Sequence, residues 1–81
     1  MARKVKCKQG ERRFTVIQVN GDAYDTHAGR SFESALRLAN PDRGAQLTVR
    51  SVCATDAGAA RLPSVYRKRG YVTKRMRYKR G

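Results

Sequence analysis

The sequence lacks long apolar runs and is poor in acidic residues. Its 81 residues include 6 Asp and Glu against 19 Lys and Arg, giving a formal net charge of +13. No segment approaches the roughly 18 consecutive apolar residues of a membrane-spanning helix, and no apolar stretch follows the basic start as it would in a secretory signal. We therefore expect a small cytoplasmic protein that neither enters a membrane nor is exported.

Cysteine pairs at metal-binding spacing are also absent. Cys7 and Cys53 are the two cysteines, and neither belongs to a Cys-x-x-Cys motif. Each falls where a buried apolar residue is expected. We therefore expect a reduced, buried pair in preference to a disulfide or a metal site.

Catalytic motifs are missing as well. The chain contains no glycine-rich phosphate loop, no nucleophile elbow and no zinc-site spacing. Asp22, Asp25 and His27 form one suggestive cluster, because two carboxylates and a histidine could hold a metal in a nuclease. However, Asp22 follows Asn20-Gly21 and is expected to be a turn residue. We predict a non-enzymatic protein with no cofactor and no bound metal.

Positive charge is concentrated at the two ends of the chain. Residues 1–13 carry six basic residues and one acid, residues 14–60 carry four basic residues and five acids, and residues 61–81 carry nine basic residues and no acid. Charge of this size destabilises a compact state and favours association with an anionic partner. Nucleic acid is the commonest such partner, so we expect DNA or RNA binding.

The hydrophobic pattern predicts an α+β fold. Alternation in residues 4–8 and β-branched residues at 12–19 indicate two strands, of which the second is apolar on both sides and therefore central. Asn20-Gly21 predicts a hairpin turn leading into a strand over 22–28. A further strand is predicted over 46–54, and the small, glycine-rich segment after it is interpreted as a mobile connector.

One short helix is predicted between these strands. Ser31 is a good N-cap, Phe32, Ala35 and Leu36 follow helical spacing, and Asn40 precedes a proline. We expect an antiparallel sheet of about four to five strands packed against this helix, forming a single domain over 1–60.

The remaining residues, 61–81, form a basic segment that is partly ordered or completes the sheet. A strand or hairpin around 64–79 is preferred, and a tail that orders only on its ligand is the alternative. Strict alternation in a strand would put Lys74 and Tyr78 on one side, with Tyr71, Arg75 and Arg77 on the other.

The two basic ends are the candidate nucleic-acid site. Lys and Arg neutralise phosphates without reading sequence, and tyrosines stack on unpaired bases or hydrogen-bond phosphates. Nothing matches a zinc finger, an RNP motif or a recognition helix, so we predict sequence-independent binding. The predicted contact residues are Lys4, Lys6, Lys8, Arg12, Arg13, Arg67, Lys68, Arg69, Tyr71, Lys74, Arg75, Arg77, Tyr78, Lys79 and Arg80.

A second hypothesis comes from a resemblance. The run FTVIQVNGDAYDTHAGRSFESALRLAN…AQLTVRSV, with Ser31, Ala35 and Ala39 at four-residue spacing, resembles small phage-encoded accessory proteins that inhibit CRISPR-Cas surveillance complexes. The resemblance spans residues 14–52 and implies an anti-CRISPR protein that binds a host protein or ribonucleoprotein complex in the host cytoplasm. A third hypothesis is a ribosomal-like RNA-assembly protein.

Overall fold

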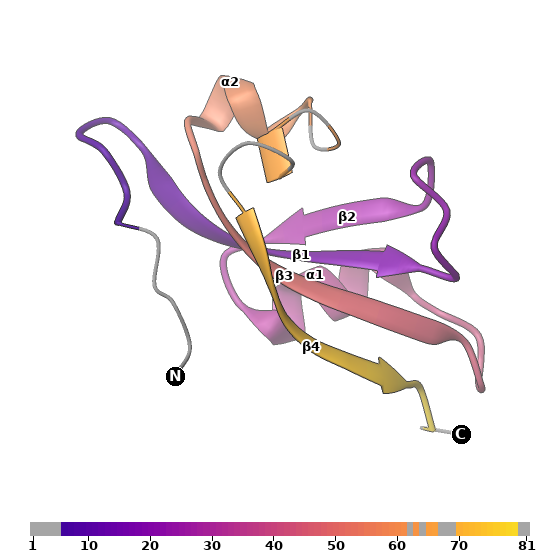
Figure 1. Cartoon of the computed structure of the whole chain (residues 1–81). Coiled ribbons are helices and arrows are strands. Elements are labelled where there is room, and N and C mark those ends of the chain that lie inside the picture. Colours follow the sequence, from indigo (N-terminus) through magenta and orange to yellow (C-terminus); the bar gives the residue numbers. More distant parts are fainter. Residues whose placement is uncertain (1–5, 62, 64, 67–69, 80–81) are drawn as a thin grey trace.

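The computed structural model describes residues 6–61, 63, 65–66 and 70–79. It confirms the predicted α+β fold. Four antiparallel strands of the described chain form one sheet in the order β2-β1-β3-β4, accompanied by the short helices α1 and α2 (Figure 1). The elements are β1 (Arg12–Val19), β2 (Thr26–Gly29), α1 (Phe32–Ala39), β3 (Gln46–Ala54), α2 (Asp56–Ala59) and β4 (Gly70–Arg77). No helix among the described residues is long and apolar enough to cross a membrane.

β1 and β3 are the central strands, and side chains pack on both of their faces. They pair antiparallel along their whole length, from Arg12 opposite Ala54 to Val19 opposite Leu47. Val16 and Ile17 point to opposite faces of β1, yet both are fully buried. The prediction that the 12–19 strand is central is therefore confirmed, because a strand can be apolar on both sides only when both faces are covered.

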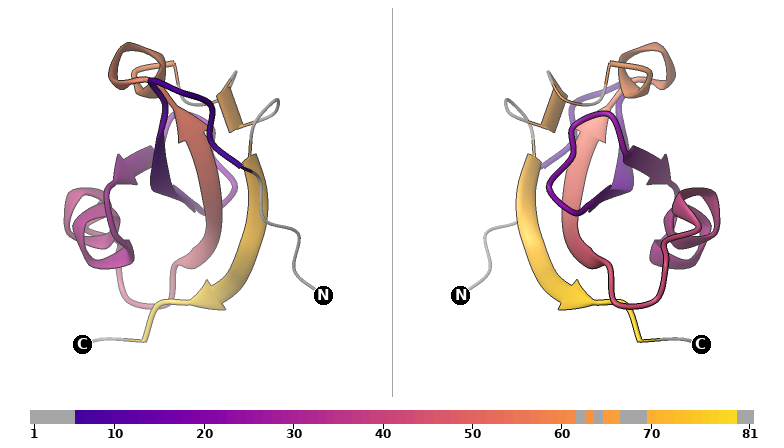
Figure 2. Two further views of the ribbon diagram at one scale, coloured as in Figure 1. Left: turned by 90° about the vertical axis from the view of Figure 1, so that its left-hand side faces the viewer. Right: turned by 90° about the vertical axis from the view of Figure 1, so that its right-hand side faces the viewer.

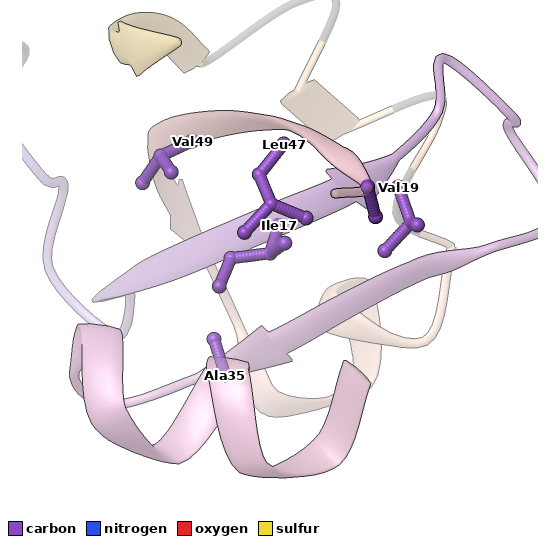
Figure 3. Packing of buried hydrophobic residues seen from close by; sticks show 6 residues of the cluster. Ile17, Val19, Ala35, Leu47 and Val49 are labelled. Carbon is purple, nitrogen blue, oxygen red and sulfur yellow. The ribbon is translucent and has the colours of Figure 1, made fainter. Parts of the chain in front are cut away.

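Helix α1 covers one face of the sheet, which we call the α1 face. The Ser31 hydroxyl accepts a hydrogen bond from the Ser34 amide at 3.2 Å, and Asn40 ends the helix in the left-handed conformation. Figure 3 shows Ala35 pointing from the helix toward the strands. The buried residues of this cluster are Ile17, Val19, Ala35, Ala45, Leu47 and Val49.

A second buried cluster covers the other face, which we call the outer face. It consists of Val16, Val52, Ala54 and Tyr66. The segment that follows β3, where we predict a mobile connector, contains α2, whose N-cap Thr55 accepts a hydrogen bond from the Gly58 amide. Tyr66 comes after this segment and is buried in the outer-face cluster.

The connection after β1 is longer than a two-residue hairpin. Asn20 and Gly21 both have positive φ, as predicted, and the Asp22 amide bonds to the Val19 carbonyl. A second turn follows, in which the Asp25 amide bonds to the Asp22 carbonyl and the Asp22 carboxylate accepts from the Tyr24 amide. The predicted strand over 22–28 therefore starts only at Thr26, because local hydrogen bonds to Asp22 satisfy the backbone groups before it.

The N-terminal segment is held by a disulfide and not by strand pairing. Cys7 is bonded to Cys53, with their Cα atoms 5.2 Å apart, so the expectation of reduced cysteines is wrong. Residues 6–8 are not a strand, which corrects the prediction over the described part of 4–8. The reason is local: the Lys8 amide donates to the Glu11 carboxylate and the Glu11 amide donates to the Lys8 carbonyl, so these backbone groups are satisfied in a turn. Cys7 therefore reaches Cys53 through its side chain, not by adding a strand.

β4, which lies in the basic C-terminal segment, is the fourth strand of the sheet. It pairs with β3 alone and forms one edge of the sheet, with β2 at the other. Figure 2 shows that the sheet is strongly curved, so that the end of β4 bends toward the side on which α1 lies.

Replacing Cys7 with Ser should lower the free energy of unfolding by about 2–4 kcal/mol, because the bond links residues 46 positions apart and restricts the unfolded chain. Urea unfolding without reductant measures the loss. A reductant should bring the wild type down to the level of the variant. Identical wild-type and variant curves without reductant would contradict a stabilising disulfide.

Gly29→Ala should destabilise the packing of α1 on β2 by about 1–3 kcal/mol. A Cβ at this position would lie 2.5 Å from the Ala35 amide nitrogen and 2.7 Å from the Ser34 Cβ, so the helix must shift. Thermal unfolding measures the effect. Arg30→Gln, at the adjacent exposed position, is the control and should leave the midpoint nearly unchanged. Equal midpoints for Gly29→Ala and the wild type would show that the helix accommodates the methyl group.

Candidate nucleic-acid interface

A β-bulge in β4 determines on which face of the sheet each of its basic side chains lies. Val49 pairs with Lys74, whereas Arg50 pairs with Val72, which leaves Thr73 as an extra residue in β4. The Thr73 hydroxyl donates a hydrogen bond to the Val49 carbonyl at 3.2 Å. Paired residues of an antiparallel sheet share a face, so the bulge shifts the alternation by one residue.

The bulge changes which side chains lie together. Tyr71, opposite Ser51, and Lys74, opposite Val49, are both on the α1 face. Arg75, opposite Thr48, is on the outer face. The prediction of strict alternation, which separated Tyr71 from Lys74, is therefore wrong, because it allowed no extra residue.

The α1 face carries a cavity of about 580 Å³, which we call the Arg13 pocket. An Nη atom of Arg13 donates to the Ser51 hydroxyl at 3.0 Å and to the Tyr71 hydroxyl at 3.4 Å. The Lys74 Nζ lies 5.2 Å from the centre of the Phe32 ring. The lining residues are Arg13, Thr15, Phe32, Val49, Arg50, Ser51, Tyr71, Thr73 and Lys74.

The outer face carries a row of guanidinium groups. Arg75 and Arg77 pair with Thr48 and Gln46, and so share this face with Arg50. The Arg50 guanidinium stacks 4.6 Å from the centre of the Tyr66 ring. Its Nε is buried with no hydrogen-bond partner in the described part of the chain. The aromatic face therefore offsets part of the cost of burying this charge.

The other predicted basic residues lie at the two ends of the sheet. Arg12 opens β1 opposite the end of β3, and the disulfide holds the segment containing Lys6 and Lys8 at the same end. Lys79 follows β4 at the other end. Tyr71 and Lys79 are eight residues apart, which in extended chain is about 26 Å. The predicted residues are therefore spread along the sheet and over both of its faces, and do not form one compact cluster.

The strip formed by Lys74, Arg75, Arg77 and Lys79 is not neutralised by nearby acids. Within the described residues, no Asp or Glu side chain lies within ion-pairing distance of these four. Asp25 instead pairs with His27 at 2.8 Å beside β2, at the opposite edge of the sheet. No group of three metal-ligating side chains converges in the portion described, so the suggestive acid–histidine cluster remains a two-residue pair.

The tyrosines occupy three different environments. Tyr66 is only 6% exposed and anchors the outer-face core. Tyr78 packs against the α1-face core and lines a second cavity, of about 400 Å³, with Leu36 and Arg37. Tyr71 is half-buried in the Arg13 pocket. The predicted contacts Lys4, Arg67, Lys68, Arg69 and Arg80 lie outside the described residues.

Sequence reasoning missed six of the nine residues that line the Arg13 pocket, namely Thr15, Phe32, Val49, Arg50, Ser51 and Thr73. The sequence predicts Phe32 as a residue of the apolar face of the helix. Ser51 and Arg50 lie in a predicted strand that is recognised by its apolar residues, so its polar residues gave no signal of a site. Their grouping depends on pairing between distant strands, which no local spacing reveals.

Comparison with known proteins gives no assignment, since no family model matches the chain and no curated protein or solved structure is similar to it.

Arg75 and Arg77 should differ in their effect on stability. An Arg77 Nη donates to the Gly44 carbonyl at 2.9 Å and so holds the loop before β3, whereas no such bond is formed by Arg75 within the described chain. Arg77→Gln should therefore lower the free energy of unfolding by about 1 kcal/mol. Arg75→Gln, its matched control, should change it by less than about 0.5 kcal/mol. Equal losses in urea unfolding would contradict a specific role for the Arg77 bond.

Proposed function

We propose that this protein binds nucleic acid without catalysing a reaction, through phosphate contacts made by the basic strip of β4 and the basic start of β1. The observation that carries the proposal is that the exposed cations of the strip have no acidic neighbour among the described residues. Lys and Arg placed in this way release counterions from a phosphate chain, and this release favours binding.

The binding should be independent of base sequence. α1 exposes few side chains that could read base edges, and no described helix is long enough to serve as a recognition helix. The basic residues of β3 and β4 on the outer face are arginines, and guanidinium groups favour bidentate phosphate contacts.

A cytoplasmic location is part of the proposal. Reduced cysteines would favour this location, but Cys7 and Cys53 form a disulfide, and disulfides persist mainly in oxidising compartments. The proposal of a cytoplasmic location therefore depends on the proposed partner alone, because nucleic acid is abundant in the cytoplasm.

Salt dependence of binding tests the proposal. If about six to eight phosphates are contacted, the slope of log K against log salt should lie between about −4 and −7. Fluorescence anisotropy with a short labelled oligonucleotide measures it. Arg75→Gln should reduce the magnitude of the slope by about 1. Arg30→Gln removes the same charge near the opposite edge of the sheet and should leave the slope unchanged.

A slope near zero would exclude this mechanism, and equal effects of Arg30→Gln and Arg75→Gln would show that net charge, not the strip, drives binding. A pull-down from lysate with and without nuclease provides the second test. Nuclease should release the bound material. A single host protein retained after nuclease treatment would instead support the inhibitor hypothesis, and recovery of ribosomal particles would support the RNA-assembly hypothesis.

A further inference from the structure

The Arg13 pocket differs from the rest of the basic strip because it is a recess in the surface. Residues of β1, β3 and β4 line it together with Phe32 of α1, and its volume of about 580 Å³ is within the usual range for small-ligand sites. A flat basic surface contacts only the outer atoms of an anion. A recess can also contact the groups attached to that anion, provided that they can extend into it.

The hydrogen bonds inside the pocket leave donors available. Arg13 donates to the oxygens of Ser51 and Tyr71. Each hydroxyl therefore accepts from the guanidinium and keeps its own hydrogen for another acceptor. Arg13 thus orients two hydroxyl donors in addition to carrying positive charge. Two hydroxyl donors beside a guanidinium are suited to binding a phosphate, which is anionic and rich in hydrogen-bond acceptors.

The walls of the pocket supply a second cation and an apolar surface. The Lys74 ammonium lies over the Phe32 ring, and this contact holds it beside the pocket. Val49, which points toward the α1 side in Figure 3, contributes apolar surface. No acidic side chain is among the described lining residues. A phosphate that carries an attached, partly apolar group fits this combination.

We propose that the Arg13 pocket binds the phosphate of one unpaired nucleotide, so that the protein prefers single-stranded to double-stranded nucleic acid. The inference rests on the proposed function and narrows its ligand. In a duplex, the sugar and base attached to each phosphate are fixed by pairing and stacking. Only an unpaired nucleotide is free to enter a cavity of this size together with its phosphate.

Titration with uridine 5′-monophosphate, followed by NMR of the backbone amides, tests the pocket directly. We expect saturable shifts at Ser51, Thr73 and Lys74, and uridine should bind at least about tenfold more weakly because it lacks the charged acceptor. Lys74→Gln and Tyr71→Phe should each weaken binding of the monophosphate by about fivefold or more. Tyr71→Phe keeps the ring, so its thermal midpoint should stay close to that of the wild type.

Two further variants separate the pocket from general electrostatics. Arg30→Gln removes one charge away from the pocket and should leave monophosphate affinity unchanged. Arg75→Gln, next to Lys74 but on the outer face, should weaken it less than Lys74→Gln does. Single-stranded oligonucleotides should bind the wild type more tightly than duplexes of the same sequence, and Lys74→Gln should reduce that difference.

The inference is overturned if the three pocket amides do not shift, if Lys74→Gln and Arg75→Gln weaken the monophosphate equally, or if single and double strands bind alike. Oligonucleotide binding with the expected salt slope would in those cases leave the proposed function intact. Loss of the salt slope would instead remove the proposed function itself.

Discussion

The antiparallel pairing of β1 with β3 is the constraint on which the rest of the structure depends. Both strands are covered on both faces, so each alternating residue must be apolar or engaged in a specific contact. Arg50 is the one charged residue of β3, and its guanidinium stacks on the Tyr66 ring. The pair supplies most of the core, while β4 beside it carries three basic residues and no acid.

The arrangement also explains how a small chain tolerates its positive charge. Basic side chains are spread along β4 and the start of β1 and are not gathered at one point, which reduces their mutual repulsion. The disulfide adds stability that a short chain with a small core otherwise lacks. Charged residues on β4 have a structural benefit as well, since they discourage the open edge of the sheet from pairing with another chain.

The sequence predicts some parts of this molecule closely and others not at all. The bounds of β1 and β3 follow from their β-branched runs, and those of α1 from Ser31 and Asn40, because these signals are local. The disulfide and the outer-face core were not predicted, since both join segments that only the complete topology brings together. Arg13, Tyr71 and Lys74 were chosen for their charge and aromaticity, but no spacing indicated that they would share one cavity.

The bulge at Thr73 makes the chemistry of β4 depend on its pairing register as well as on its composition. If Thr73 instead paired regularly with Val49, the side chains that follow it would turn to the other side of the sheet. Lys74 would then lie opposite Thr48 on the outer face, and the cavity would lose one of its cations without any change of residue type. A shift in register at this one point of the strand is therefore a route by which related chains could gain or lose an anion pocket, while keeping the same core and the same charge.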